Sequence, residues 1–273
     1  MDKLKPIRCL GQNFLVDNNI VKKIVSRVIE TGNDNNFNNK KVIEIGPGMG
    51  ALTKYLLDYG ADLTCYDLDL RSVEYLKEKF STYKNFNVIH SDILKISLKE
   101  TKDTYSIIGN IPYNITNDII FWLVENRCNI DKAILTMQSE VADRLTAKVK
   151  TKLYGTTSVI LKLFCDVKVL FKITPAAFYP PPKVTSAVVA LLFENKSLYS
   201  NINKEKLCEL IRSSFSQRRK KLSNSLRTYF LLHEINQAKL NDTLISEGKN
   251  YMNCRAEELT IEQYIDFFEY IWI

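Results

Sequence analysis

The first part of the chain alternates between two hydrophobic periodicities. Short segments rich in apolar and β-branched residues, typical of strands, begin at Lys41 and recur at four later places: Asp62–Asp67, Phe86–His90, Tyr105–Ile108 and Lys132–Met137. Between them, apolar residues recur three and four positions apart, as on one face of an amphipathic helix. Strands that alternate with helices in this way predict a doubly wound α/β sheet.

The later part of the chain has a different pattern. Ser158–Phe164 and Val167–Ile173 are predicted to add further elements to the sheet domain, and Ser186–Phe193 is predicted to be an antiparallel edge strand. After this strand the composition becomes polar, and the remaining pattern is helical. We therefore expect a sheet domain at residues 1–195 and a small all-helical domain at residues 196–273.

A turn after the fourth predicted strand, residues 109–114, reads Gly-Asn-Ile-Pro-Tyr-Asn. Pro112 ends the strand, because proline has no N–H for the ladder and a fixed φ. The turn therefore places an amide (Asn110), two backbone carbonyls and an aromatic ring (Tyr113) at the carboxyl end of a strand, where open α/β sheets bind ligands. The oxygens can accept hydrogen bonds from an amino group, and the ring can stack on a flat heterocycle.

A glycine-rich turn follows the first predicted strand. Gly46, Gly48 and Gly50 let the backbone approach a ligand closely, and the helix that follows presents free N–H groups. The next strand ends in Asp67, about 20 positions after Gly46. A carboxylate at this spacing suits the hydroxyls of a ribose. The pattern predicts a cofactor that contains a nucleoside, with a purely structural turn as the alternative.

The charge near the glycine turn favours one such cofactor. Glu44 lies two residues before the first glycine, and Pro47 lies inside the turn. A carboxylate so close disfavours the pyrophosphate of a dinucleotide, whereas it suits the sulfonium and ammonium groups of S-adenosylmethionine. Alternatively, Glu44 accepts an N–H hydrogen bond that braces the turn. After the third strand, Asp92 is a candidate acceptor for the adenine amino group, with Ile93 beside the ring; a helix cap or turn role is the alternative.

Three further segments carry candidate binding residues. Phe178 lies in the stiff, proline-rich loop of residues 175–183, where its ring either forms the second wall of a stacking slot opposite Tyr113 or packs into the core. Three lysines of one short loop face either a phosphate backbone or solvent: Lys148, Lys150 and Lys152. Four consecutive cations predict contacts with RNA phosphates, with a solvated helix face as the alternative: Arg218, Arg219, Lys220 and Lys221.

Composition excludes several other classes of protein. Of the 273 residues, 45% are hydrophobic and 25% are charged, and no apolar run is long enough to cross a membrane. No apolar segment follows the charged N-terminus, so a secretory signal is not expected. Two histidines and six scattered cysteines argue against a metal centre, a His-based triad and a disulfide framework, and for a reducing cytosol. The net charge of +7 is compatible with a polyanionic partner.

These motifs occur in the order found in a known family. The sequence resembles the KsgA/RsmA family of ribosomal RNA adenine dimethyltransferases, whose relatives include the Erm antibiotic-resistance methyltransferases. The segments that carry the resemblance span nearly the whole chain: Gly11-Gln-Asn-Phe-Leu15, Glu44-Ile-Gly-Pro-Gly-Met-Gly50, Gly109-Asn-Ile-Pro-Tyr-Asn114, Glu140-Val-Ala-Asp-Arg-Leu145, Tyr154-Gly155, Phe178-Tyr-Pro-Pro-Pro-Lys-Val-Thr-Ser-Ala187 and Phe215-Ser-Gln-Arg-Arg-Lys220. Their combination is specific to the family, although no single segment is.

The resemblance implies a Rossmann-like, S-adenosylmethionine-dependent methyltransferase domain followed by a helical domain that binds RNA or the ribosome. It implies cofactor contacts from six residues: Asn13, Leu15, Gly46, Asp67, Asp92 and Asn110. The glycine turn and the segment after the third strand add three further candidates, which are Glu44, Gly48 and Ile93. The family usually has glutamate where Asp67 stands, and the shorter side chain still supplies a carboxylate. In the implied chemistry, Asn110 and the Ile111 carbonyl accept the two N–H bonds of an adenine N6, while Tyr113 and Phe178 stack the base.

The resemblance also implies a target. This is N6 of two adjacent adenosines in the hairpin loop near the 3′ end of 16S rRNA, dimethylated in the small subunit or its precursor by a cytoplasmic monomer that takes part in subunit biogenesis. Gly11 and the Gln217-Arg-Arg-Lys220 segment favour this target over an Erm-like role, in which one adenosine of 23S rRNA is methylated and macrolide resistance follows. A third hypothesis is a ribosome-assembly factor without catalysis, which the intact Asn110 and Tyr113 disfavour.

Overall fold

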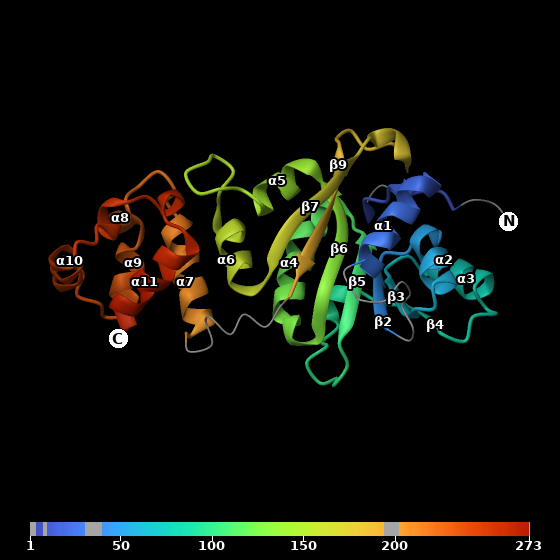
Figure 1. Ribbon diagram of the computed structural model, residues 1–273, viewed down its shortest axis with the longest axis horizontal. Coiled ribbons are helices and arrows are strands. Elements are labelled where there is room, and N and C mark those ends of the chain that lie inside the picture. Colours follow the sequence, from blue (N-terminus) through green and yellow to red (C-terminus); the bar gives the residue numbers. More distant parts are fainter. Residues whose placement is uncertain (1–3, 8–9, 31–39, 194–201, 273) are drawn as a thin grey trace. The chain divides into compact units, whose positions relative to one another are not determined.

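The computed structural model describes residues 4–7, 10–30, 40–193 and 202–272 (Figure 1). By their internal contacts, the residues divide into two compact units. The first unit consists of Met1–Ala142 and Asp166–Glu194, and the second consists of Asp143–Cys165 and Asn195–Ile273. Both candidate binding turns belong to the first unit.

The first unit is built on a seven-stranded sheet with the strand order β4-β3-β2-β5-β6-β9-β7. Each neighbouring pair from β4 to β6 is parallel, whereas β9 pairs antiparallel with both β6 and β7. The strands are β2 (Lys41–Ile45), β3 (Asp62–Asp67), β4 (Phe86–His90), β5 (Tyr105–Asn110), β6 (Ile130–Gln138), β7 (Asp166–Ile173) and β9 (Ser186–Leu192). The predicted α/β sheet is therefore confirmed.

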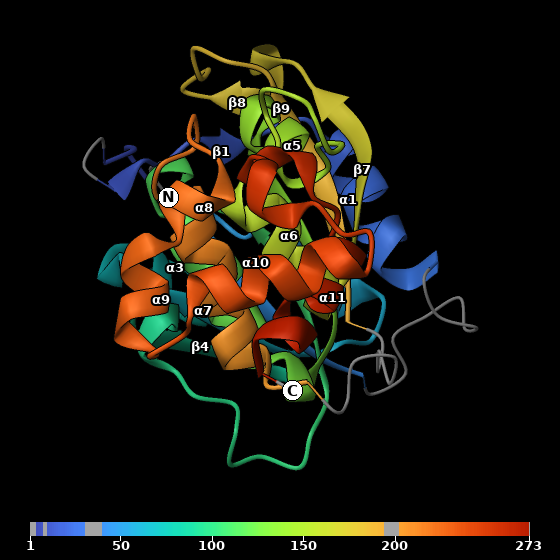
Figure 2. The same ribbon diagram turned by 90° about the vertical axis from the view of Figure 1, so that its left-hand side faces the viewer.

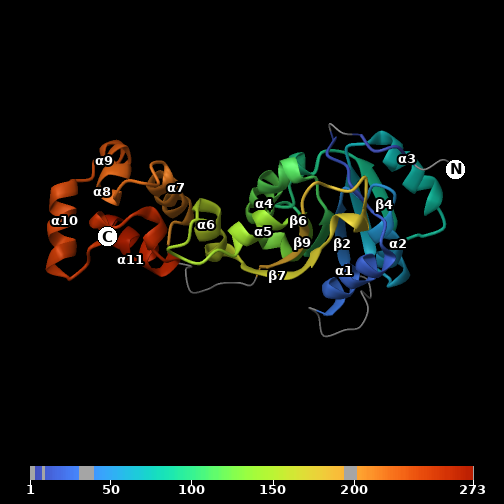
Figure 3. The same ribbon diagram turned by 90° about the horizontal axis from the view of Figure 1, so that it is seen from above.

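Helices cover both faces of this sheet (Figure 3). On one face, α1 (Asn18–Glu30), α2 (Ala51–Asp58) and α3 (Leu70–Lys79) share a core with strand residues such as Val42 and Ile108. Figure 3 shows α4 (Thr116–Glu125) on the opposite side of the sheet from α1. Short helical turns complete this unit: η2 (Ile93–Lys95), η3 (Tyr113–Ile115), η4 (Arg127–Asn129) and η5 (Pro175–Ala177).

The order of the strands reverses between β2 and β5. From β2 the chain proceeds outward through β3 and β4, and it then returns to place β5 on the other side of β2. Ligands of open α/β sheets bind at the carboxyl ends of the strands beside such a reversal. Near this edge, a separate two-stranded sheet pairs β1 (Phe14–Leu15) with β8 (Phe178–Tyr179) in antiparallel register. It ties the N-terminal segment to the proline-rich loop.

Two sequence-based expectations about the sheet differ from the structure. Ser186–Phe193 was expected at the edge, but β9 lies between β6 and β7, so β7 is the edge strand. Ser158–Phe164, expected in the sheet domain, forms most of α6 (Thr156–Phe164) and belongs to the second unit. Side-chain periodicity did not distinguish these cases, because a buried helix and a buried strand are both continuously apolar. The expected boundary at residues 195 and 196 lies outside the described residues.

The second unit is helical in its described part (Figure 2). Tyr154 joins the segment before α6 to the C-terminal helices, because its hydroxyl donates a 3.0 Å hydrogen bond to the Leu259 carbonyl. Side chains cap two of its helices: the Asn203 side chain accepts from Lys206 N–H, and Thr260 and Gln263 form a reciprocal capping box. The helices are α5 (Ser139–Leu145), shared between the units, α6, α7 (Lys204–Phe215), α8 (Leu222–Ser225), α9 (Arg227–Leu232), α10 (Gln237–Ser246) and α11 (Ile261–Trp272), with the turns η7 (Tyr251–Asn253) and η8 (Ala256–Glu258).

Within the described residues, no helix combines the length and the apolar character that a membrane span requires. The same residues contain no group of three or more His, Cys, Asp or Glu side chains that could hold a metal ion.

Candidate active site

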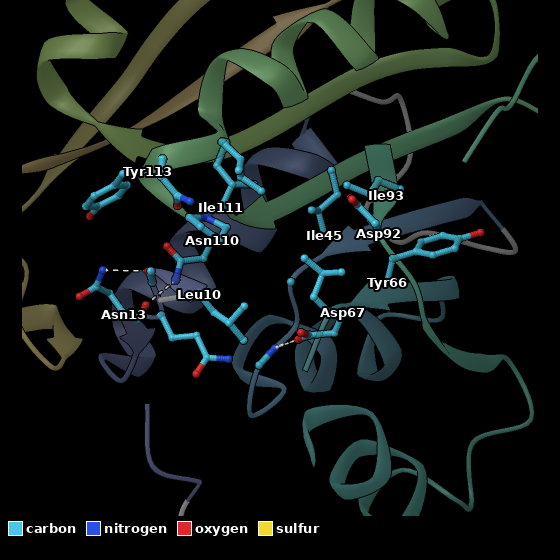
Figure 4. Close-up of a pocket in the computed structure, with 18 of the residues that line it drawn as sticks. Leu10, Asn13, Ile45, Tyr66, Asp67, Asp92, Ile93, Asn110, Ile111 and Tyr113 are labelled. Carbon is cyan, nitrogen blue, oxygen red and sulfur yellow. Dashed lines mark hydrogen bonds between the residues drawn. The ribbon is translucent and has the colours of Figure 1, made fainter. Parts of the chain in front are cut away.

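A pocket opens at the carboxyl ends of the central strands, beside the reversal of strand order (Figure 4). The ends of β2, β3 and β5 form its floor, the segment after β4 forms one side, and N-terminal residues from Leu10 to Phe14 form another. In Figure 4, Asn110 and Tyr113 lie toward one end of the pocket, and Asp67 and Asp92 lie toward the other. The two turns identified from the sequence therefore meet in one site.

Asn110 is the last residue of β5, and its amide is held in one orientation. Its Nδ2 donates a 2.7 Å hydrogen bond to the backbone carbonyl of Asn13. Because a carbonyl can only accept, this bond assigns the nitrogen to Asn13 and leaves Oδ1 available as an acceptor. The strand can approach β2 closely here only because residue 109 is glycine: a Cβ at Gly109 would lie 2.8 Å from the Ile45 carbonyl oxygen.

The two carbonyls after Asn110 differ in their use. The Pro112 carbonyl accepts a 3.3 Å hydrogen bond from Ile115 N–H as the chain turns into η3. Among the hydrogen bonds of the described loop residues, none uses the Ile111 carbonyl. The Tyr113 hydroxyl lies 2.6 Å from Ser186 Oγ, which anchors the half-buried ring, and burial raises the pKa of that hydroxyl. The turn thus presents one free amide oxygen, one free carbonyl and one fixed ring.

At the other end, the glycine turn and Asp67 are joined by hydrogen bonds. Asp67 Oδ2 accepts from Gly48 N–H at 3.1 Å, and Oδ1 accepts from Asp69 N–H at 2.9 Å. The carboxylate is only 8% exposed, and this burial raises its pKa, while the two N–H groups act in the opposite direction. Gly46 and Gly48 both have positive φ, but only at Gly46 would an added Cβ meet nothing within 4 Å. Gly46 therefore keeps open the space above the turn.

Glu44 braces the turn from below and does not line the main pocket. Its Oε2 accepts a 2.7 Å hydrogen bond from Thr53 Oγ1 of α2 and lies 3.5 Å from Cys65 Sγ of β3. The side chain is 1% exposed, and burial raises its pKa to about 7. It lines a smaller hollow behind the turn, which also borders Asn110. The bracing interpretation fits these contacts, because the Thr53 hydroxyl donates to Glu44 and a backbone hydrogen bond at Thr53 also acts to lower the pKa of Glu44.

Asp92 and Ile93 both line the pocket. Asp92 Oδ1 accepts a 3.0 Å hydrogen bond from Leu94 N–H and so caps η2. The cap uses one of the two carboxylate oxygens, which leaves the other for a ligand. Ile93 is 4% exposed and supplies an apolar surface beside it. The two interpretations of Asp92, cap and ligand acceptor, are therefore compatible.

The N-terminal segment and the proline-rich loop were expected to contribute residues to the site. Some of these residues line the pocket, and others lie in the core. Asn13 lines the pocket and supplies the carbonyl that orients Asn110. Leu15 is 5% exposed, belongs to the core cluster and borders only the smaller hollow. Phe178, opposite Leu15 in the β1–β8 pair, is 3% exposed and packs in the same cluster. Side chains alternate between the two faces of a strand, so Tyr179 points outward while Phe178 points into the core. The Phe178 ring therefore does not face the pocket, and the expected stacking role opposite Tyr113 is wrong.

Several pocket residues were not predicted from the sequence, among them Leu10, Gln12, Tyr66 and Leu68. Tyr66 and Leu68 flank Asp67 at the end of β3, and Leu68 is half exposed although it is apolar. Both could have been predicted from their position next to Asp67, because a ligand bound to that carboxylate must also contact the neighbouring residues. Leu10 and Gln12 carry no comparable signal, because the fold alone brings the N-terminal segment to the pocket.

The four consecutive cations of the second unit are not equivalent. Arg218 forms an ion pair with Glu257, and its Nη2 donates to the Thr151 carbonyl. Lys221 Nζ donates to Asn253 Oδ1 while its side chain stays exposed. Arg219 and Lys220 are exposed, and no ion pair of the described residues uses them. One of the four charges is thus neutralised within the protein, and the other three remain candidates for contact with phosphates.

The pocket fits S-adenosylmethionine by the chemistry of its lining. Asp67 lies where a ribose is expected, Ile45 and Ile93 supply apolar surface that suits a flat ring, and Gly46 leaves room above the turn. With the doubly wound sheet, these features define the class of the protein: it is an S-adenosylmethionine-dependent methyltransferase. The chain belongs to the ribosomal RNA adenine dimethylase family, whose sequence profile matches residues 5–272.

Similar proteins agree with this assignment along the whole chain. A ribosomal RNA small subunit methyltransferase A from Malacoplasma penetrans is 39% identical over 264 residues, which cover 96% of this chain and 92% of the relative. The protein of the same name from Mycoplasma mobile is 42% identical over 236 residues, covering 86% and 89%.

Two solved structures share the fold. A dimethyladenosine transferase from Plasmodium falciparum is 26% identical, with a TM-score of 0.77 over 93% of this chain and 95% of that one. The 23S rRNA methyltransferase ErmE is 27% identical, with a TM-score of 0.69 over 95% and 99%.

Proposed function

We propose that this enzyme dimethylates N6 of two adjacent adenosines in the hairpin loop near the 3′ end of 16S rRNA. The reaction takes place in the cytoplasm, on the small subunit or its precursor, and contributes to subunit biogenesis. The observation that carries the chemistry is the Asn110 amide: its nitrogen is bound to the Asn13 carbonyl, so its oxygen is left for a substrate amino group. The names of the curated relatives support the choice of the small subunit.

The geometry explains how an adenine amino group becomes reactive. The lone pair of N6 is delocalised into the ring, which makes the nitrogen a poor nucleophile. Asn110 Oδ1 and the Ile111 carbonyl, both without a described partner, can accept its two N–H bonds and favour a pyramidal nitrogen. S-adenosylmethionine supplies an electrophilic methyl group when bound. The protein then only has to align donor and acceptor, which is a positioning effect.

Tyr113 holds the base in this position. Its ring is fixed by the hydroxyl contact with Ser186 and lies in the same turn as both acceptors. An adenine must leave its stack to reach the turn, so a loop or single-stranded target is favoured. After one transfer, N6 retains a single N–H bond, and the base must turn or rebind before the second transfer.

The second unit supplies candidate contacts for RNA. Arg219, Lys220 and Lys221 project from the turn before α8. The loop that contains Lys150 and Lys152 lies beside this turn, because Arg218 donates to the Thr151 carbonyl and Lys150 N–H donates to the Glu257 carbonyl. These cations would contact phosphates. The double variant Arg219→Ala/Lys220→Ala should weaken RNA binding and lower the slope of log K against log salt by about 1 per lost contact; an unchanged slope would exclude them.

The target is tested with ribosomal particles from cells that lack this gene. Immature small subunits are incubated with the enzyme and labelled cofactor, large subunits serve as the matched control, and methylated adenosines are then mapped. We expect two adjacent dimethylated adenosines in 16S rRNA and no label in 23S rRNA. Label confined to a single 23S adenosine would overturn the proposal and establish the Erm-like alternative, which the 27% identity to ErmE keeps open.

A purely structural role in ribosome assembly is a separate alternative. It predicts that the Asn110→Ala variant restores normal subunit maturation in cells that lack the gene. Our proposal predicts that the parent protein restores methylation of the two adenosines in these cells and that the variant does not, whereas a structural factor leaves them unmethylated in both cases. The free acceptor oxygen of Asn110 favours catalysis, because an assembly factor would have no use for it.

A further inference from the structure

The N-terminal wall of the pocket is fastened by a side-chain network that the reaction itself does not require. The network joins the N-terminal arm, defined here as residues 4–7 and 10–13, to the start of α3. Its three side chains are Gln12 on the arm and Asp69 and Arg71 after β3. They lie at the end of the pocket that holds Asp67, opposite Asn110.

Gln12 uses both ends of its amide. Its Oε1 accepts a 2.8 Å hydrogen bond from Ile7 N–H, which folds the arm on itself. Its Nε2 donates a 3.0 Å hydrogen bond to Asp69 Oδ2, which ties the arm to the sheet. Because Asp69 is ionised and only accepts, the orientation of the Gln12 amide is fixed from both sides.

Arg71 holds Asp69 in place for this bond. Its Nε and Nη2 donate to the two oxygens of the Asp69 carboxylate at 2.9 and 2.7 Å, a bidentate pair. The same Nη2 lies 3.3 Å from the Lys5 carbonyl on the arm. Asp69 is 5% exposed, and the Arg71 hydrogen bonds lower its pKa. The carboxylate therefore stays charged and bound.

The network also reaches the predicted ribose site. Asp69 N–H donates a 2.9 Å hydrogen bond to Asp67 Oδ1, so a movement of Asp69 displaces the carboxylate that lines the pocket. The arm has a second attachment at the other end of the pocket, where the Asn13 carbonyl accepts from Asn110 Nδ2. Between these points, Gly11 adopts φ +63 and packs against the turn after β5: a Cβ there would lie 3.0 Å from Asn114 Oδ1.

We propose that Gln12, Asp69 and Arg71 form a latch that holds the N-terminal arm over the S-adenosylmethionine pocket and sets the rate at which cofactor and product exchange. Arg71 is a positioning residue, because it does not line the pocket and acts only through Asp69 and the arm. The exchange rate matters for this enzyme under the proposed function, since every methyl transfer to one substrate needs a fresh cofactor. The latch itself depends only on the cofactor site, not on the RNA target.

The first test measures release of labelled S-adenosylhomocysteine from the purified protein, without RNA. Arg71→Ala should accelerate release and raise Kd about three- to tenfold, the range expected for the net loss of one ordinary hydrogen bond. Arg127→Ala, which removes an arginine that follows α4 and donates to the Val124 carbonyl in its last turn, is the matched control and should leave both values unchanged. Arg71→Lys keeps the charge without the fork and should fall between the two.

The second test distinguishes a latch from a simple helix cap. Asp69 also caps α3, so Arg71→Ala could act by loosening that helix alone. Hydrogen exchange of the cofactor-free protein separates the two: a latch predicts faster exchange in residues 4–13, whereas a cap predicts faster exchange only in the first turn of α3. Exchange confined to α3, or a release rate equal to that of Arg127→Ala, would overturn the proposal.

A double-variant cycle provides the third test and does not rely on Arg71 alone. Because Gln12 and Arg71 both act through Asp69, Gln12→Ala should accelerate release less in the Arg71→Ala background than in the parent protein. Fully additive effects would overturn the latch. If Arg71→Ala does not fold, the cycle is measured with Arg71→Lys. Failure of any of these tests leaves the rRNA target unaffected, since none of them uses RNA.

Discussion

The two ends of the pocket hold their polar groups in opposite ways. At the cofactor end, both oxygens of Asp67 already accept backbone N–H groups, and Glu44 beneath the turn is bound to Thr53. At the acceptor end, Asn110 uses only its nitrogen, and the Ile111 carbonyl is free among the described loop hydrogen bonds. Apart from the second oxygen of Asp92, the protein itself satisfies these polar groups at the cofactor end, whereas it leaves those at the acceptor end to the substrate.

This difference suggests a division of labour. A polar group that the protein itself satisfies contributes to stability and is preorganised before any ligand arrives. A group left unsatisfied contributes little to the fold, and its hydrogen bond is made only with substrate. Changes at the acceptor end should therefore act on catalysis, and changes at the cofactor end should act on stability and cofactor binding. Substitutions at each end of the pocket can test this distinction.

Asn110→Ala gives the largest expected effect. Removal of the free oxygen should lower kcat about 100- to 1,000-fold, the range seen when one preorganised group is removed from an active site. The free energy of unfolding should change by no more than about 1 kcal/mol, because only the bond to the Asn13 carbonyl is lost. Single-turnover methyl transfer and urea unfolding measure the two quantities.

Asn117→Ala is the matched control for this change, because Asn117 is exposed on α4 and does not line the pocket. It should behave as the parent protein in both assays. Full activity in Asn110→Ala would show that the free acceptor oxygen is not used. A large loss of stability would show that the acceptor end is as structural as the cofactor end.

Glu44→Gln tests the cofactor end through pH. Burial raises the pKa of Glu44 from 4.5 to about 7, so the folded protein binds a proton more readily than the unfolded chain. The stabilising contribution is fully present below the unfolded pKa and is lost as pH rises toward 7. The loss is on the order of 3 kcal/mol. Glutamine keeps an acceptor for Thr53 but does not titrate, so it should remove this decline in urea unfolding between pH 5 and 7.5. A parallel decline in both proteins would contradict the assignment.

Two substitutions of Tyr113 test the acceptor end of the pocket. Tyr113→Ala removes the stacking surface and should raise KM for the RNA substrate by about ten- to a hundredfold, from the 1–3 kcal/mol that a base–aromatic contact contributes. Tyr113→Phe keeps the ring and loses only the contact with Ser186, so its effect should stay below about tenfold. Equal effects of the two substitutions would assign the role to the hydroxyl and not to the ring.

The sequence was informative where a residue type has few alternative uses. The strand ends, the glycine turn, Asp67 and the Asn110 turn were all placed correctly, because proline, glycine and strand-end polar residues constrain the backbone directly. Phe178 and Ser158–Phe164 were misplaced, because an apolar side chain gives no sign of the surface that it will meet. The contact between Gln12 and Asp69 was missed, because the two residues are distant in the sequence.

The pair Gly46→Ala and Gly48→Ala gives the smallest but most direct comparison within the cofactor end. Both residues have positive φ, so alanine at either position should cost about 1–2 kcal/mol of stability. Only at Gly48 would the new methyl group also meet the Phe14 ring, at 2.8 Å, and we expect roughly a further 1 kcal/mol of destabilisation there. At Gly46 the methyl meets no protein atom within 4 Å and instead enters the cofactor space. Gly46→Ala should therefore be the more stable variant in urea and yet bind S-adenosylhomocysteine more weakly by calorimetry. Weaker binding by Gly48→Ala than by Gly46→Ala would mean that the space above Gly46 is not where the cofactor binds, and lower stability of Gly46→Ala would contradict the expected clash with Phe14.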